Sequence, residues 1–578
     1  MKNVNLKLYF MLISLIALGF TSCIKDDTTS PDPIPPTMNT ISISGSGKVF
    51  EATLLFSEAV YKTSTATGNL DNTSFQVTVS GGTGSLEGYE VSHIAGGNSV
   101  LITVNLSDYS DGTELLAISP ASATSIYNAE GVALSVSEQK TIAISGTTHE
   151  TITIVDSGNG TGTTTWTANN TYVLSGFVFV NSGQTLTIEA GTVIKGAEGQ
   201  EADASALIVA RGGKIMAEGS AEKPIIMTSV LDDLEGSVNR TQRGLWGGLI
   251  VLGSATLNSS PGVSNIEGIP TTEPRGEYGG TNDADNSGVL KYVSIRHGGT
   301  NIGEGNEING LTLGAVGSST VIDYIEVISN ADDGIEFFGG APQVKHALIA
   351  YCGDDCYDYD EGFHGQGQFW LAIQDVNDGD RIGEHDGGTD PETAEPYATP
   401  YIYNATYIGR GADAGKRTIT FRDNAGGFYR NSIFLNQAQG IDIENLASAE
   451  DSYAQFERGN LKLESNIFYN IAGQTSGDDA AANGAALFTI AGTGADATEL
   501  AASQAAFAAY FANANNTVAD PGVTAANPIP ANAVGGTMAD IAGTTANFNA
   551  SFFTTVSYKG AFDPAGENWA SWTKYYEQ

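Results

Sequence analysis

Short runs of alternating apolar and polar residues dominate the chain from about residue 151 onward. Gln184–Glu189 alternates in this way, Ala206–Val209 and Pro224–Ser229 are short and largely apolar, and glycine, asparagine or serine closely follows most such runs. This alternation predicts half-buried β-strands joined by tight turns. Because successive side chains of a strand point to opposite faces, we expect Leu186 and Ile188 to lie in one core column.

Two stretches in the middle of the chain repeat one pattern at an interval of 22 residues. Residues 324–337 read YIEVISNADDGIEF, and residues 346–359 read HALIAYCGDDCYDY. A unit of strands that recurs every 20 to 30 residues or so is typical of a solenoid, and predicts a parallel β-helix. In that register three pairs of acids stack on successive coils: Asp332 on Asp354, Asp333 on Asp355, and Glu336 on Asp358.

Similar strands continue toward the C-terminus, with long insertions at 258–287 and 377–400. Asp496–Asn513 predicts a single helix with Asp496 as its N-cap, and we expect it to pack on the flank of the solenoid. The aromatic C-terminus, from Phe552 to Trp572, is expected to cap the open end of the core. The β-helix and this cap together take up residues 148–578.

Residues 41–147 form a separate set of short strands, which include Glu51–Phe56 and Val100–Val104. Their number and spacing predict a β-sandwich. Leu54–Val60 and Ile126–Gly131 resemble segments of bacterial Ig-like domains. This resemblance implies an Ig-like sandwich that acts as a spacer or as an adhesive module. The expected fold class is therefore all-β: an N-terminal Ig-like β-sandwich followed by a large right-handed parallel β-helix.

Residues 1–22 have the pattern of a secretory signal peptide, because two lysines precede the apolar run Leu8–Phe20 and small residues follow it. Phe20–Cys23 resembles the lipobox of bacterial lipoproteins, which implies lipidation of Cys23. The alternative is a plain secreted protein. Residues 23–40 would be a lipidated, proline-rich tether. Ile24–Asp27 resembles the surface-export signal of Bacteroidetes lipoproteins, so we expect a cell-surface location on the outer membrane, with membrane contact through the lipid alone.

The chain is strongly acidic, with 66 acidic against 26 basic residues and a formal net charge of -40. Such a charge argues against binding to nucleic acids or to anionic lipid surfaces. The repeated acids are the candidate functional residues. Five of them are predicted ligands of a metal ion, Ca²⁺ first, since Ca²⁺ takes about six to eight oxygen ligands: Asp332, Asp333, Asp354, Asp355 and Asp358. Two alternatives stay open, namely solvated turn acids and catalytic carboxylates.

A catalytic interpretation would use Asp354, Asp355, His364 and Arg381. The order of Asn330–Gly334, Gly353–Asp355, Gly362–Gly365 and Arg381–Gly383 loosely resembles the motifs of polygalacturonases, although the histidine motif has an extra residue and the final lysine is missing. The protein would then be a glycoside hydrolase or a polysaccharide lyase acting on polyuronates. His385 is a further histidine near these acids.

Cys352 and Cys356 lie on either side of the Gly-Asp-Asp turn. A local disulfide between them is the first expectation for a protein outside the cytoplasm. Two buried thiols are the alternative, and a zinc site lacks further ligands nearby.

Several motifs in order resemble one family over about residues 151–576. They are LTIEAGTVIKG, DDGIEFFGG, GDD, DGDR, PYIYNATYIG and YKGAF. The chain resembles the right-handed β-helix lipoproteins with the pectin-lyase-like fold. We therefore expect a surface lipoprotein whose β-helix binds an extracellular ligand, with a glycan first and an envelope protein second, and with possible help from Ca²⁺. An enzyme acting on polyuronates, and an adhesin or accessory subunit of an uptake complex, are the alternatives.

Overall fold

The computed structural model describes residues 33–303, 306–388, 391–446, 450–477, 480–493, 496–531 and 548–576. The signal peptide, Cys23 and most of the tether lie outside these residues. The chain divides into two compact units, with the boundary between Thr147 and Thr148. No helix of the described part is long and apolar enough to cross a membrane.

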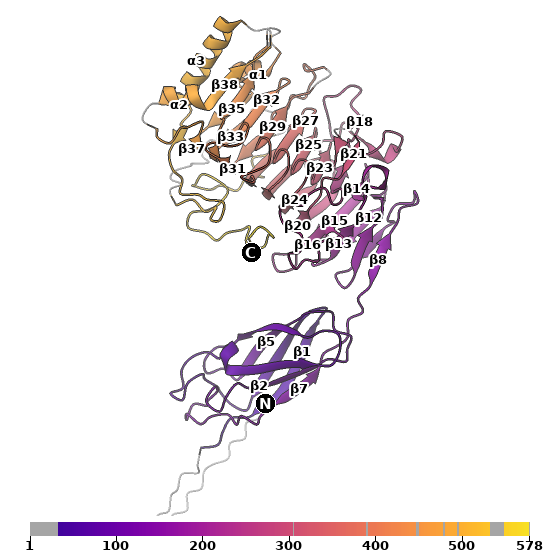
Figure 1. The fold of residues 1–578 in the computed structure, drawn as a ribbon, viewed down its shortest axis with the longest axis vertical. Helices are drawn as coiled ribbons and strands as arrows, with labels where there is room; N and C mark the ends of the chain where they lie inside the picture. Colours follow the sequence, from indigo (N-terminus) through magenta and orange to yellow (C-terminus); the bar gives the residue numbers. More distant parts are fainter. Residues whose placement is uncertain are drawn as a thin grey trace, which may run out of the picture. The chain divides into compact units, whose positions relative to one another are not determined.

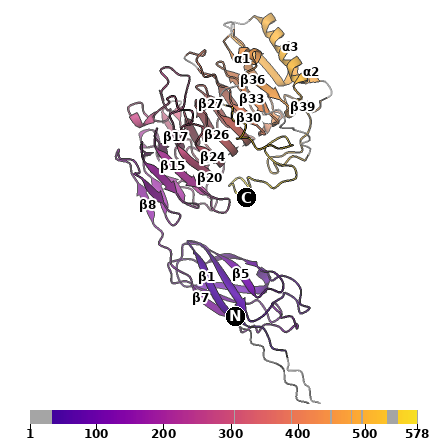
Figure 2. The same cartoon turned by 180° about the vertical axis from the view of Figure 1, so that it is seen from behind.

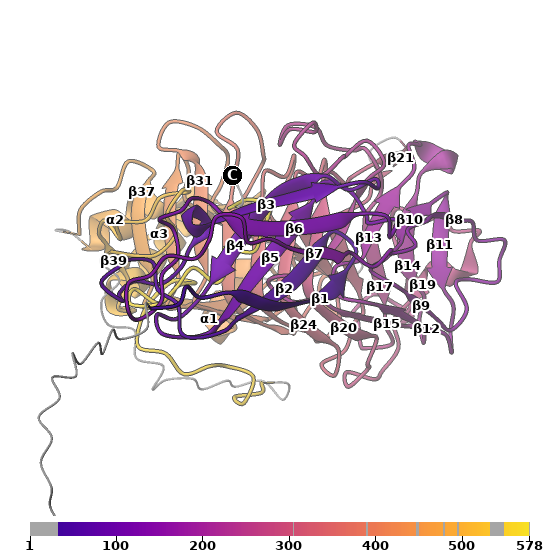
Figure 3. The ribbon, with the colours of Figure 1, turned by 90° about the horizontal axis from the view of Figure 1, so that it is seen from below.

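The first unit consists of two antiparallel sheets, visible in Figure 3. One sheet has the order β1-β2-β5-β4 and the other the order β3-β6-β7. Alternation along β5 buries Val100, Ile102 and Val104 in a core that both sheets share. The strands are β1 (Met38–Ser46), β2 (Val49–Phe56), β3 (Phe75–Ser80), β4 (Leu86–Ser92), β5 (Ser99–Leu106), β6 (Leu115–Pro120) and β7 (Lys140–Ala143), with a 3-10 turn η1 (Asn72–Ser74). These sheets are consistent with the expected sandwich, and β1 begins within the range assigned to the tether.

The second unit is a parallel β-helix, which confirms the expected fold class (Figures 1 and 2). Its 10-stranded sheet, called the site sheet below, runs in sequence order: β11 (Phe177–Val180), β14 (Ala206–Val209), β17 (Leu249–Leu252), β23 (Leu311–Gly314), β25 (Ile335–Phe338), β27 (Tyr357–Asp360), β29 (Gly383–Asp386), β32 (Ile419–Arg422), β35 (Ile441–Glu444) and β38 (Phe488–Ala491).

The other strands of the coils join in one 18-stranded sheet, called the long sheet. Its members are β8 (Thr151–Ile154), β9 (Thr164–Trp166), β10 (Thr171–Leu174), β12 (Thr185–Ile188), β13 (Val193–Gly196), β15 (Lys214–Glu218), β16 (Ile225–Ser229), β20 (Gly288–Arg296), β24 (Val321–Ile328), β26 (Gln343–Ala350), β28 (Gln366–Ile373), β30 (Tyr401–Tyr403), β31 (Thr406–Gly411), β33 (Gly427–Arg430), β34 (Ile433–Gln437), β36 (Leu461–Glu464), β37 (Ile467–Ile471) and β39 (Thr517–Val518). The insertions carry the pairs β18 (Ser264–Asn265) with β19 (Glu277–Tyr278) and β21 (Asn301–Gly303) with β22 (Asn306–Glu307), and the turns η2 (Glu201–Asp203) and η3 (Pro274–Gly276).

Four long strands of the long sheet, β20, β24, β26 and β28, each bend at one residue with a left-handed backbone. Tyr292, Tyr324, His346 and Phe369 have φ values of 51°, 55°, 45° and 61°. Their rings form a continuous stack, with centroids 4.3, 4.3 and 5.0 Å apart. Since a non-glycine residue with positive φ is costly, the stacked rings are the contacts that hold these bends in place.

The sequence predicted a helix on the flank of the solenoid and the aromatic C-terminal segment over its open end. In the structure the two positions are exchanged. The helices are α1 (Ser452–Arg458), α2 (Ala480–Leu487) and α3 (Ala497–Asn513). As predicted, Asp496 caps α3 by accepting hydrogen bonds from Thr498 N and Glu499 N. Phe507 and Phe511 of α3 pack on Phe488 of the last site-sheet strand, so this helix covers the end of the core.

The aromatic C-terminus instead runs back along the long sheet, as the yellow segment in Figures 1 and 2 shows. Trp572 packs edge-on against Tyr292, and Trp569 against Tyr324. The fully buried carboxylate of Glu326 accepts hydrogen bonds from Lys574 N and Tyr575 N. These aromatic side chains therefore pack on the ring stack along the long sheet, whereas the sequence predicted that they would cap the open end of the core.

Candidate functional site

The site sheet carries acids at the outward positions of three consecutive strands. Ile335 and Phe337 of β25 point into the core, so Glu336 between them points outward. The strand register places Asp358 of β27 beside Glu336, and Glu384 of β29 beside Asp358. The interval of 22 residues between Glu336 and Asp358 is the one that the sequence repeat predicts. Neighbouring coils lie about 4.8 Å apart, so these carboxylates form a closely spaced column.

The turns that precede these strands add further acids. Asp355 N donates a hydrogen bond to Asp333 Oδ1 at 2.8 Å, so these two residues stack as expected. Four overlapping groups bring one carboxylate oxygen from each member to within 4.8 Å of the others. The members of these four groups are called the acidic cluster below. They are Asp332, Asp333, Glu336, Asp354, Asp355, Asp358, Asp380 and Glu384.

The inner members of the acidic cluster are buried. Asp355 is 1% exposed, Asp333 7% and Glu336 8%. They are therefore not solvated turn acids, although Asp354 is exposed and fits that description. Asp355 Oδ2 and Asp358 Oδ1 are buried without a hydrogen-bond donor, and so is the side-chain oxygen of the fully buried Asn309. Buried oxygens that lack a donor are costly, so they mark a place for a cation or a proton.

The pKa values of the buried acids also indicate a bound cation or a retained proton. Burial first, and repulsion by neighbouring carboxylates second, raise the pKa values of Asp333, Glu336, Asp355 and Asp358 well above the ordinary range. Adjacent buried carboxylates cannot all stay ionised without a counter-charge. At neutral pH the acidic cluster must therefore bind a cation or retain protons.

Two arginines supply positive charge on one side of the acidic cluster. Arg381 Nη1 lies 3.1 Å from Glu384 Oε1 and 3.8 Å from Asp355 Oδ2. Arg422 of β32 reaches Glu384 at 2.9 Å and Asp386 at 2.7 Å. Burial opposes the charge on Arg381, but the surrounding carboxylates raise its pKa, so its guanidinium stays protonated. The acids in these ion pairs lie on β29 or beside it. No described arginine or lysine lies within salt-bridge distance of Asp333 or Glu336.

The histidines are not part of this arrangement. His364 follows β27 at the end opposite Asp355, where its Nδ1 contacts Gly362 O at 2.7 Å and its Nε2 lies 3.6 Å from Asp283 Oδ2. His385 points into the core, stacks on Tyr359 at 3.9 Å and pairs with the Tyr429 hydroxyl at 2.8 Å. Burial lowers the pKa of His385 to about 3, so it remains neutral. Of the predicted catalytic residues, the structure brings together Asp354, Asp355 and Arg381, but not His364.

Cys352 and Cys356 are free, buried thiols, which is the alternative to the expected disulfide. Both side chains belong to the apolar core beneath the acidic turn. Burial raises the pKa of Cys352 to about 12 and that of Cys356 well above its ordinary value. They are packing residues that hold the turn from below.

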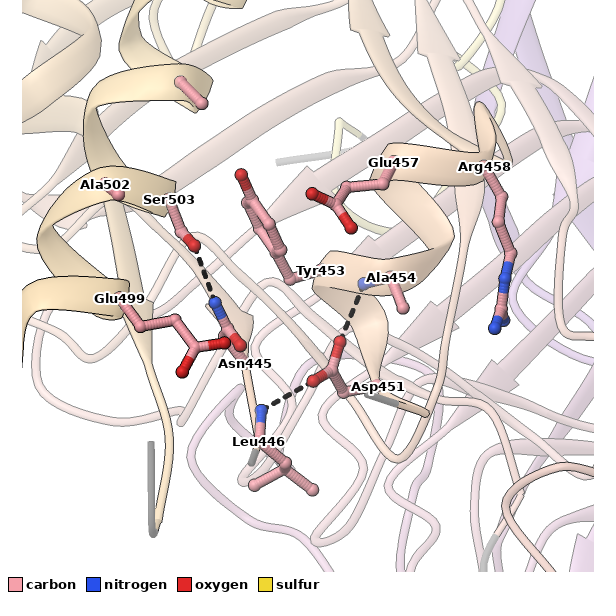
Figure 4. Close-up of a pocket in the computed structure, with 11 residues that line it drawn as sticks. Asn445, Leu446, Asp451, Tyr453, Ala454, Glu457, Arg458, Glu499, Ala502 and Ser503 are labelled. Carbon is pink, nitrogen blue, oxygen red and sulfur yellow. Dashed lines mark hydrogen bonds between the residues drawn. The ribbon is translucent and has the colours of Figure 1, made fainter. Parts of the chain in front are cut away.

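Sequence reasoning missed Glu384, Asp380, Asn309 and Arg422. Extra residues precede β29, so Glu384 follows Asp358 by 26 residues and falls outside the 22-residue period. The signal that could have found it is the alternation GEHD at 383–386, which matches YDYD at 357–360. A separate cavity of about 540 Å³ between α1 and α3 contains none of the predicted residues (Figure 4).

The fold and the site together define a parallel β-helix protein with a buried carboxylate cluster on one sheet. A family model described as a pectate-lyase-like β-helix domain matches residues 158–512. That match covers more than half of the chain, and the protein belongs to this family. The family fold suggests glycan-related binding or activity. No curated protein and no solved structure matches the chain.

Proposed function

We propose that the acidic cluster binds Ca²⁺ and that the bound ion, with Arg381 beside it, holds an acidic glycan on the site sheet. The observation that carries this proposal is the convergence of buried carboxylates from three coils, with oxygens of Asp355 and Asp358 left without donors. Every ligand atom on offer is an oxygen, and no histidine or cysteine belongs to the four groups. Such a set suits a hard cation such as Ca²⁺ rather than zinc.

An acidic glycan fits the edge of this site. A uronate carboxylate is itself an oxygen ligand for Ca²⁺, and the guanidinium of Arg381 can donate a charge-assisted hydrogen bond to a carboxylate. Arg381 is 23% exposed and Arg422 is 40% exposed, so a ligand in solvent can reach both. Uncharged glycans would lack both interactions.

We further infer that the protein acts at the cell surface, anchored by a lipid on Cys23 and separated from the membrane by the first unit. The lipobox-like residues before Cys23 support this inference. Cell fractionation of a Cys23→Ser variant tests it, and retention of that variant in the outer membrane would argue against it.

Calorimetric titration of the full chain with Ca²⁺ tests the metal site. We expect wild type to bind Ca²⁺ and to gain thermal stability, because a ligand at 100 times its Kd stabilises a fold by about 2.7 kcal/mol. The double variant Asp355→Asn, Asp358→Asn should lose at least 100-fold in affinity. Asp442→Asn is the matched control, since Asp442 lies in the same outward column two strands beyond Glu384.

In a second titration, an oligogalacturonate is added to the full chain with and without Ca²⁺, to test glycan binding. Tighter binding in the presence of Ca²⁺ than in its absence, in wild type but not in the double variant, supports the proposal. An absence of both binding heat and thermal shift in wild type would refute the metal site, and equal binding by wild type and the double variant would place the ion elsewhere.

A polyuronate lyase is the second candidate, favoured by the position of Arg381 next to the acidic cluster. In β-elimination a base takes the proton beside the uronate carboxyl, the glycosidic C–O bond breaks and a C=C bond forms. The raised pKa of Arg381 argues against its acting as that base. Ultraviolet-absorbing unsaturated products made by wild type but not by Arg381→Gln would favour the lyase; intact polymer would favour binding alone.

A further inference from the structure

A second cavity, of about 510 Å³, is lined in part by Tyr351, which lies just before the turn that carries Asp354 and Asp355. Its walls come from the turn after β26, from the segment that follows β28, and from the C-terminal segment. The lining side chains used below are Arg240, Tyr351, Gln374, Tyr575 and Tyr576. A volume of this size is in the range of small-molecule sites, roughly 300 to 1,000 Å³.

Three tyrosine rings form one wall of this tyrosine cavity. Tyr351 and Tyr575 have ring centroids 5.4 Å apart, and Tyr575 and Tyr576 have centroids 4.6 Å apart. The hydroxyls of Tyr575 and Tyr576 both donate to Ala525 O at 3.2 Å. These bonds fix the two rings before any ligand arrives, so little conformational entropy is lost on binding.

Arg240 supplies the charged group of the tyrosine cavity. Its guanidinium lies 4.6 Å from the Tyr351 ring centroid and its Nη1 donates to the Tyr351 hydroxyl at 3.0 Å. Asp375, its one described ion-pair partner, lies 3.5 Å from Nε. The side chain is 48% exposed, so the outer edge of the guanidinium remains open to a ligand carboxylate.

Gln374 connects the tyrosine cavity to the acidic cluster. Its side-chain amide donates to Asp380 O at 3.2 Å and to Arg381 O at 2.9 Å. One wall of the cavity therefore holds the backbone of two residues at the edge of the acidic cluster.

We propose that the tyrosine cavity is a second glycan site, which takes one uronic acid residue without Ca²⁺. The sugar ring would pack on Tyr575 and Tyr576 by its apolar C–H faces, and its carboxylate would bind Arg240. The site needs no member of the acidic cluster, so it stands or falls separately from the function proposed above.

Saturation-transfer NMR of the full chain in chelator tests this site, with galacturonate as the acidic probe and galactose as the neutral one. Galacturonate should bind, galactose should bind at least 10-fold more weakly, and Arg240→Gln should lower galacturonate affinity at least 10-fold. Tyr576→Ala should weaken both sugars, with a melting curve to verify its fold. Arg458→Gln, in the cavity of Figure 4, should leave binding unchanged.

Two further results separate the sites. Galacturonate binding in chelator should persist in the Asp355→Asn, Asp358→Asn variant, whatever that variant does to Ca²⁺. No transfer to galacturonate in wild type, equal affinity in Arg240→Gln, or loss of galacturonate binding in the Asp355→Asn, Asp358→Asn variant would each overturn the proposal for the tyrosine cavity.

Discussion

Alanine in place of Trp370 is expected to destabilise the β-helix by about 3 to 5 kcal/mol, the usual loss for a large buried aromatic residue. Trp370 is 1% exposed and lies in the core directly beneath the site. Its ring stacks on Tyr357 at 4.6 Å and on Phe337 at 5.7 Å, and its Nε1 donates to Val344 O at 3.0 Å. The substitution leaves a cavity and removes the donor of that buried bond.

Denaturant unfolding of the full chain, followed by near-ultraviolet circular dichroism, measures this effect. Val321→Ala on β24 is the control: Val321 is 48% exposed, so its loss should stay within about 0.5 kcal/mol. A loss below about 1 kcal/mol for Trp370→Ala would show that the aromatic stack does not support the β-helix as described.

Raising the pH from 5 to 8 in chelator should weaken the β-helix through Asp386. Burial raises the pKa of Asp386 to about 7, although Arg422 opposes the rise. The folded chain thus holds a proton that the unfolded chain releases near pH 4, so the stabilisation is complete below pH 4 and is lost as the pH rises through 7. About two pH units separate pH 5 from the folded pKa of about 7, so the loss between pH 5 and pH 8 is on the order of 3 kcal/mol, at roughly 1.4 kcal/mol per unit.

Thermal melting against pH, with wild type and Asp386→Asn side by side, measures this linkage. The variant has no proton to lose there, so its advantage over wild type should grow from pH 5 to pH 8. Asp413→Asn, at an exposed position, should follow wild type throughout. Parallel curves for wild type and Asp386→Asn would contradict the assigned protonation.

The coils and the acids of the repeat could be predicted because their signal is local. Alternation and a 22-residue interval define which side chains face inward and which residues pair, as Glu336 and Asp358 do. The positions of Glu384 and Asn309 do not follow from the 22-residue interval, because insertions change the spacing between coils, although the alternation GEHD at 383–386 marks Glu384 as an outward residue. Their proximity depends on the closed path of each coil rather than on any sequence spacing.

The placement of the C-terminal segment and the free state of the cysteines could not be predicted for a different reason. An apolar stretch such as Trp569–Trp572 can cover any apolar surface, and only the three-dimensional ring stack at Tyr292 and Tyr324 distinguishes one surface from another. Spacing allowed a Cys352–Cys356 disulfide, but both side chains instead pack into the core.

Diffraction from crystals of the full chain soaked in a lanthanide ion that replaces Ca²⁺ tests the carboxylate site most directly. We predict an anomalous peak among the carboxylates of Asp355, Asp358 and Glu384 or of Asp333, Glu336 and Asp358, the two groups that include Asp358. A map with no peak at these carboxylates, or with peaks at exposed acids alone, would contradict the account.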